Sequence, residues 1–95
     1  NLTNTNLEKA RLNDSNLTGA NLTNTNLKKA RLGNVNLSKA NLTGAVLTGS
    51  DLKGANLEGA TGLNPSQINL AVTDKQTKLP DYLEEEMDDD FLLQM

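Results

Sequence analysis

The 95-residue chain has few of the side chains on which enzyme catalysis usually depends. It has no histidine and no cysteine, so a Ser–His or Cys–His pair, a disulfide and a Cys/His metal site are all excluded. Only carboxylates and lysines remain as candidate bases. The run Asp88-Asp89-Asp90 attracts cations loosely, but three consecutive carboxylates do not converge on one ion as an EF-hand loop does. We therefore expect no enzyme activity, no metal site and no cofactor.

Charged side chains are divided unevenly along the chain. Residues 1–63 carry seven Lys and Arg against four Asp and Glu, a net charge of +3, whereas residues 64–95 carry two against eight, a net charge of −6. Arg11 and Arg31 lie 20 positions apart, with Asp51 a further 20 beyond. They are candidate interaction residues forming a basic stripe. The alternative is two exposed arginines with one ion pair to Asp51, which would add little stability.

The framework that must position these side chains is marked by leucine, which occurs at every fifth position from Leu2 to Leu57. Five matches neither the 3.6-residue period of a helix nor the two-residue period of a strand, so the leucines share one face only if the chain turns a corner every five residues. That pattern indicates a solenoid of short extended pieces joined by turns. The leucines expected in the core are Leu7, Leu12, Leu17, Leu22, Leu27, Leu32, Leu37, Leu42, Leu47, Leu52 and Leu57, with Leu2 starting the series.

Small residues stand two positions before each leucine and should also point inward. The segment NLTNTNL recurs unchanged at 1–7 and 21–27, and a shift of 20 gives more identities than a shift of 15 or 25. Twenty residues therefore make one four-sided coil, and residues 1–60 make three coils. We expect stacked Asn amides to hydrogen-bond between coils, and the glycine-rich turns of the third coil to differ in type. The small core residues include Ala10, Ala20, Ala30, Ala40, Ala45 and Ala55.

Residues 1–60 resemble the pentapeptide-repeat family, whose repeat pattern is A(D/N)LXX. The chain looks like a small bacterial member of that family. ANLTG at 40–44 and ANLEG at 55–59 are full matches, and the resemblance covers residues 1–60. It implies an all-β solenoid, a right-handed quadrilateral β-helix of about three coils, with the leucine and the small residue pointing inward. Some members of this family resemble duplex DNA in shape and negative charge, and bind DNA gyrase.

A short helical cap is expected where the repeat ends. We place the repeat domain at residues 1–62 and the cap helix and acidic tail at 63–95. Asn64 is the expected N-cap, Pro65 the first helical residue and Gln67 the N3 partner of a capping box, with the helix running to about Val72. Leu63, Ile68 and Val72 should close the open end of the leucine column.

A second helix is expected after Pro80, with Asp81 as N-cap. Leu83, Met87 and Phe91 would share one face of it. This acidic segment is either a tail folded on the cap or a docking element for a partner, using Phe91 and Leu92. The chain begins at Asn1 within the pattern, so we also expect the first coil to stack on further repeats or on another copy.

These features favour a non-enzymatic structural or protein-interaction module with an unidentified protein partner. The alternative is DNA-mimic binding to gyrase, which needs an acidic cylinder, whereas residues 1–63 are mildly basic. Nucleic-acid binding is not expected, because a net charge of +3 is spread around the four sides of the coil. The chain also offers just two aromatic side chains for base stacking, Tyr82 and Phe91. No apolar run is long enough to cross a membrane. We favour a cytoplasmic location for the protein. An export compartment is the alternative, because the sequence begins at Asn1 within the repeat pattern. Self-association through the ends or the tail is a further expectation.

Overall fold

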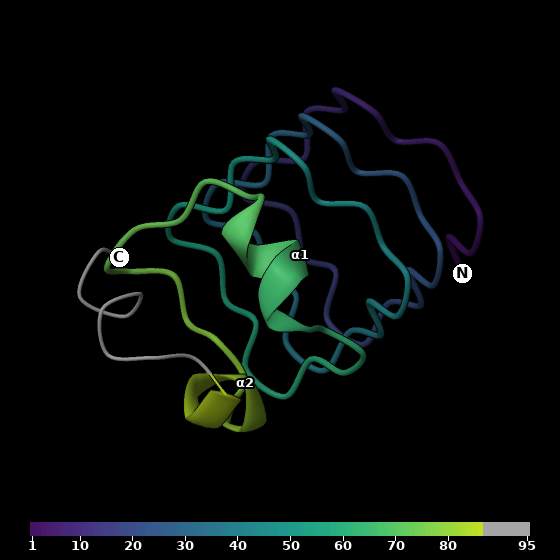
Figure 1. The fold of residues 1–95 in the computed structure, drawn as a ribbon. Coiled ribbons are helices and arrows are strands. Elements are labelled where there is room, and N and C mark those ends of the chain that lie inside the picture. Colours follow the sequence, from purple (N-terminus) through teal and green to yellow (C-terminus); the bar gives the residue numbers. More distant parts are fainter. Residues whose placement is uncertain (87–95) are drawn as a thin grey trace.

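The computed structural model describes residues 1–86 and shows a four-sided coil that stacks on itself (Figure 1). Parallel bridges join residues 20 apart, such as Asn6 with Asn26, Arg11 with Arg31 and Asn16 with Asn36. Each bridge is a single residue, because each side of the coil is too short to form a longer strand. The 20-residue coil predicted from the sequence is therefore correct.

Each corner is a tight turn closed by the leucine. The leucine carbonyl accepts a hydrogen bond from the N–H three residues on, as from Ala10 to Leu7 (3.0 Å) and from Ala30 to Leu27 (3.0 Å). The residue two after the leucine has a positive φ at every corner from Asn4 to Gly59. A positive φ at that place is typical of a type II turn. The expectation that the third-coil turns differ in type is therefore wrong, because glycines and non-glycines adopt the same conformation.

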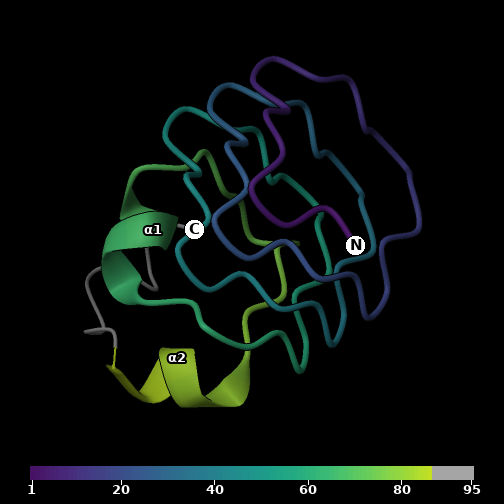
Figure 2. The same ribbon diagram turned by 90° about the vertical axis from the view of Figure 1, so that its right-hand side faces the viewer.

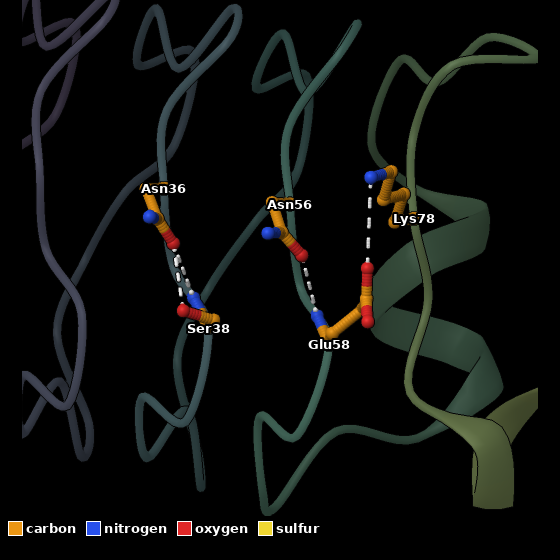
Figure 3. Close-up of polar contacts among 5 residues, drawn as sticks. All are labelled: Asn36, Ser38, Asn56, Glu58 and Lys78. Atoms are coloured by element: carbon orange, nitrogen blue, oxygen red, sulfur yellow. Dashed lines mark hydrogen bonds and ion pairs between the residues drawn. The ribbon is translucent and has the colours of Figure 1, made fainter.

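The Asn or Asp before each leucine supports its own side of the coil. Its Oδ1 accepts from the backbone N–H two residues on, as Asn36 does from Ser38 (3.0 Å) and Asn56 from Glu58 (3.0 Å) (Figure 3). The Ser38 hydroxyl also donates to the same Asn36 oxygen (2.8 Å). These bonds lie within one coil, so the expected amide bonds between stacked asparagines are wrong. The oxygen that such a ladder would use is already taken by the local turn.

The core is a column of leucines lined by small residues. Leu22, Leu27, Leu32, Leu37, Leu42, Leu47, Leu52 and Leu57 are buried, as are Ala30, Ala40, Ala45 and Ala55. In the first coil, at the purple end in Figure 2, the predicted core residues Leu7, Leu12, Leu17, Ala10 and Ala20 are only half-buried. Their outer side has no further coil against it in this structure.

Helix α1 (Pro65–Asn69) covers the other end of the column. Asn64 is its N-cap, Pro65 its first residue, and Asn64 and Gln67 form the predicted capping box. The Gln67 amide also donates to the carbonyls of Leu42 (3.1 Å) and Ala45 (2.9 Å), and Ile68 and Leu63 are buried over the leucines. The helix ends at Asn69, earlier than predicted, because Leu70 and Val72 pair with the third coil instead.

Residues 70–79 add part of a fourth coil, which the sequence did not reveal. Val72 pairs with Asp51 and Lys78 with Asn56, at spacings of 21 and 22 instead of 20. Val72 is 44% exposed, so its expected place in the cap core is wrong. Its backbone is held in the ladder in the same way as that of Asp51 one coil below, and its side chain points outward.

Helix α2 (Asp81–Glu86) follows Pro80 and packs through Leu83, which is buried. Asp81 is the first helical residue, so the prediction that it is the N-cap is off by one position. The Tyr82 hydroxyl accepts a hydrogen bond from the Leu63 N–H (3.1 Å), which ties α2 to the end of the repeat. The predicted face residues Met87 and Phe91 lie outside the described residues.

Candidate functional site

A cluster of basic side chains lies on one corner of the first two coils. Lys9 and Arg11 flank this corner in the first coil, and Lys29 and Arg31 flank it in the second. All four side chains are exposed. We call these four residues the basic corner.

The backbone places the two halves of the basic corner directly over one another. The Lys9 N–H donates to the Lys28 carbonyl (2.9 Å), and the Leu12 N–H donates to the Arg31 carbonyl (2.8 Å). Arg11 and Arg31 form a parallel bridge, which sets them about 4.8 Å apart along the ladder. The stack predicted for these two residues is therefore present.

The ion pair predicted as the alternative, between Arg31 and Asp51, is not formed. Asp51 lies next in the column, but its Oδ1 accepts from the Lys53 N–H (3.0 Å) and serves its own turn. Among the described residues the ion pair lies elsewhere, between Lys78 Nζ and Glu58 Oε1 at 3.7 Å (Figure 3). Both of those side chains are more than 60% exposed, so the pair contributes at most about 1 kcal/mol.

Two apolar side chains continue the same corner toward the C-terminal end. The Leu70 carbonyl accepts from the Gly49 N–H (2.7 Å), and Val72 pairs with Asp51, so both lie one coil beyond the turn at 49–51. Leu70 is 57% exposed and Val72 is 44% exposed. We call these two residues the apolar rim.

A shallow pocket lies at the diagonally opposite corner. It has a volume of about 290 Å³ and is lined by Glu58–Thr61 of the third coil and by Pro80, Asp81 and Tyr82. The Tyr82 hydroxyl already accepts a hydrogen bond from the Leu63 N–H. The pocket is an open groove between the repeat and α2, with Glu58 and Asp81 at its edge.

Two serine hydroxyls of the repeat have structural partners. The buried Ser50 hydroxyl donates to the Leu47 carbonyl (2.9 Å), and Ser38 bonds Asn36. Ser15 is half-buried on the inner side of the first coil. The Ser50 and Ser38 hydroxyls therefore bond to a carbonyl and an amide oxygen and not to a base. Within residues 1–86, no three acidic side chains converge as a metal site would require.

The fold lowers the pKa of the Asp74 carboxyl. Its Oδ1 accepts from the N–H groups of Gly54 (3.0 Å), Gln76 (3.0 Å) and Thr77 (3.1 Å). The Gly54 bond is the main cause that holds the pKa of the Asp74 carboxyl below its ordinary value of 3.8, and partial burial works in the opposite direction. In the regular coils a backbone carbonyl accepts this bond, as Lys53 does from the Asn34 N–H, and in the fourth coil the Asp74 carboxylate takes that place, so its role is structural.

Several cap residues were missed by the sequence reasoning. Leu79 and Leu83 are buried, and the buried Thr77 hydroxyl donates to the Leu52 carbonyl (2.8 Å). Leu79 follows Leu57 by 22 residues, so the five-residue count does not find it. Leu79 could have been found from its spacing to Thr77, because a short side chain two positions before a leucine is the pattern of the regular coils. Phe91 and Leu92, the predicted docking residues, lie outside the described residues.

The repeat and its coil geometry match a known family. A family model described as pentapeptide repeats matches the chain with 8 copies, over residues 1–34 and 25–61. The chain belongs to the pentapeptide repeat family. No curated protein matches the chain.

Solved structures of pentapeptide repeat proteins agree with this fold. One from Nostoc Pcc 7120 has a TM-score of 0.68 at 27% identity, covering 83% of this chain and 73% of that chain. One from the thylakoid lumen of Arabidopsis thaliana has a TM-score of 0.54 at 24% identity, covering 94% of this chain and 66% of that one. The predicted right-handed quadrilateral β-helix is thus confirmed, and the chain is a repeat scaffold.

A third solved structure is less similar. QnrB1, a plasmid-mediated fluoroquinolone resistance protein, has a TM-score of 0.48 at 21% identity, covering 88% of this chain and 44% of that one. A likeness of that degree carries no argument about function. Among residues 1–86 of the present chain, no helix has the length and apolar character needed to cross a bilayer.

Proposed function

We propose that this pentapeptide repeat chain is a non-enzymatic module that binds another protein through the outside of its rod. The observation that carries the proposal is the register of the coils. Bridges at a spacing of 20 residues set outward side chains in columns, about 4.8 Å apart along the rod. Turns closed by backbone hydrogen bonds hold each column in place, so little conformational entropy is lost when a partner binds.

Because side chains fill the interior of the rod, its outer surface is the part available for recognition. Leucines and small residues fill the column between the second and third coils, and the cap covers its C-terminal end. Small-molecule sites are usually deep clefts that enclose most of the ligand, whereas the groove beside α2 is open and shallow. A flat, polar, regularly spaced surface suits a macromolecular partner better than a small substrate.

The proposal is tested by recovering the partner from cells that make this chain. Four variants would each change two exposed side chains on one side of the rod and leave the leucines and turn residues unchanged. We expect one variant to lose the recovered protein and the others to keep it, with equal circular dichroism in all. Recovery that does not differ among the four variants, or recovery of no protein by the native chain, would contradict the proposal.

The charge of the rod weighs against DNA mimicry. A protein that imitates duplex DNA must present negative charge along its sides, whereas residues 1–63 carry +3 and expose the basic corner. We expect no inhibition of gyrase supercoiling and no protection from quinolones in a supercoiling assay. Inhibition at low protein concentration would favour mimicry over the proposal above.

A further inference from the structure

The basic corner has features that folding alone does not require. Lys9 and Lys29 hold φ values of 63° and 59°, in the left-handed region where a side chain costs about 1–2 kcal/mol. Arg11 stacks on Arg31, and like charges facing each other across a ladder are destabilising. In the third coil the same two positions are Gly49 and Asp51, which remove both costs. Lys39 shares the positive φ at another corner, so strain alone does not mark the site. The stacked positive charge is the feature of this corner that suits the binding of a negative group.

Not every nearby residue is basic, and the neighbours define the extent of the site. Glu8 lies beside Lys9 and accepts from the Asn26 amide at 3.5 Å, while Lys28 follows it one coil above. These opposite charges offset one another. Asp51 ends the positive column on the C-terminal side, so a negative ligand is held over the first two coils.

The apolar rim indicates that a ligand of this corner carries apolar side chains as well as negative charge. Leu70 and Val72 lie on the same corner, two coils beyond Arg31. At about 4.8 Å per coil, the distance from the second coil to the rim is roughly 10 Å along the rod. A peptide that suits the whole corner is acidic at one end and apolar at the other, with about three extended residues between the two parts.

The C-terminal segment of this chain has that order of residues. Carboxylates occupy Glu84, Glu85, Glu86 and 88–90, and Phe91-Leu92-Leu93 follow directly. From Asp89 to Leu92 the extended chain spans roughly 10 Å, which equals the distance from the basic corner to the rim. Charge, apolar character and spacing therefore agree.

The same molecule's own acidic run cannot reach its basic corner. Pro80, Asp81 and Tyr82 lie against Glu58–Thr61, a corner two sides away from that of residues 9–11 and 29–31 and therefore diagonally opposite. Helix α2 runs on from there away from the N-terminal coils (Figure 2). A chain of four residues beyond Glu86 reaches at most about 14 Å, whereas the molecule is 20 Å across and the basic corner lies in the first two coils.

We propose that residues 84–95 of one copy dock on the basic corner and apolar rim of a second copy. The carboxylates lie over Lys9, Arg11, Lys29 and Arg31, and Phe91–Leu93 contact Leu70 and Val72. The inference rests on the proposed function and names its partner as this chain itself. The contact joins different surfaces of the two copies, so it is heterologous and gives rings or longer assemblies.

The test measures the mass of the full chain by light scattering after size exclusion, over a range of concentrations. We expect concentration-dependent association at about 0.1 M salt that weakens strongly at about 1 M, where the Debye length falls from roughly 10 Å to 3 Å. The corner variant Arg11→Glu/Arg31→Glu should raise the dissociation constant by about tenfold or more. The control Lys39→Glu/Lys75→Glu changes the net charge equally at other corners, and should associate like the native chain.

A compensating variant separates this contact from a general effect of charge. The tail variant Asp88→Lys/Asp89→Lys/Asp90→Lys should also fail to associate. Joining the tail and corner changes in one chain should restore part of the association, because residues 88–90 are then opposite in sign to residues 11 and 31, while Glu84–Glu86 are still opposite in sign to Lys9 and Lys29. A native chain that stays monomeric at low salt, a control that fails like the corner variant, or a combined variant that stays monomeric would each overturn the inference.

The outcome is distinguishable from a failure of the proposed function. If the native chain is monomeric but the corner variant loses a protein that the native chain recovers from cells, the module function holds and only the self-association is wrong. If the native chain recovers no protein and is monomeric, both proposals fail.

Discussion

Several corner residues occupy a backbone conformation that glycine tolerates best. Lys9, Lys29 and Lys39 have φ near +60°, as do four Asn and Asp residues at other corners. Asn and Asp accept this region readily, but lysine gains no local hydrogen bond to offset the crowding of its Cβ. At the residue scale, stability and surface charge are therefore in conflict at these lysines.

The neighbouring pair Lys28 and Lys29 provides a matched test of that conflict. Lys29→Gly should stabilise the fold by about 0.5–1 kcal/mol, because relief of the left-handed strain exceeds the added entropy of the unfolded chain. Lys28→Gly removes the same charge at an ordinary φ and should destabilise by about 0.5–1 kcal/mol. Urea unfolding of both variants measures the difference. Equal effects in the two variants would mean that the Lys29 conformation is not strained.

A second prediction at this scale concerns acid. The pKa of Asp74 is below its ordinary value of 3.8 in the folded chain, mainly because its carboxylate accepts the Gly54 N–H. Its contribution to stability is therefore present above pH 3.8 and is lost as the pH falls through the lower folded-state value. Asp74→Asn should melt earlier than the native chain at neutral pH, and the gap in Tm should narrow below pH 3.8. A gap that is constant with pH would show that the charge of Asp74 is irrelevant.

The element that carries the fold is the coil with its leucine column. Leu12, Leu32 and Leu52 occupy the same side in successive coils, and the last two are fully buried. Leu12 is only half-buried, since it lies in the first coil. The contribution of a leucine should therefore depend on its coil, although its sequence context is the same.

A series along this column tests that dependence. Leu32→Ala should cost about 2–5 kcal/mol through lost burial and the cavity left behind, and Leu12→Ala roughly half as much. Leu32→Lys should prevent folding of the middle coil, because a buried charge has no partner there. Thermal unfolding followed by circular dichroism measures all three. Equal losses for Leu12→Ala and Leu32→Ala would contradict the difference in burial.

Three coils and the α1 cap were predictable, because their signals repeat or are local. The leucine period fixes the number of corners, and Asn64, Pro65 and Gln67 mark the helix start by their chemistry. The fourth coil was not predictable, because there Asp74 and Thr77 side chains replace backbone partners and the spacing grows to 21 and 22. The same ladder shortens α1 and exposes Val72.

At the basic corner, the sequence predicted that Arg11 and Arg31 stack. It did not predict that Asp51 does not pair with Arg31 or that an apolar rim lies on the same corner. The register of 20 residues alone brings the two arginines together. Whether Asp51 pairs with Arg31 depends on which way its carboxylate turns, and the local Lys53 N–H decides that. The apolar rim could not be predicted, because it is created by the irregular fourth coil.

At the scale of the whole molecule, the chain is a polarised rod. Its first two coils carry the basic corner, and its C-terminal third carries a net charge of −6. Helix α2 starts at the corner diagonally opposite the basic one. This arrangement favours contact between copies over contact within one.

The most direct test of this account is a cross-link between two copies, which is simple because the native chain has no cysteine. One copy would carry Val72→Cys in the apolar rim and the other Leu92→Cys in the C-terminal segment. The control would place Thr18→Cys, an exposed residue beside the opposite corner, against the same Leu92→Cys partner. After mild oxidation at low salt, we predict a disulfide-linked pair for Val72→Cys in clear excess over the Thr18→Cys control. Equal yields, or no linked pair with either, would contradict docking at this corner.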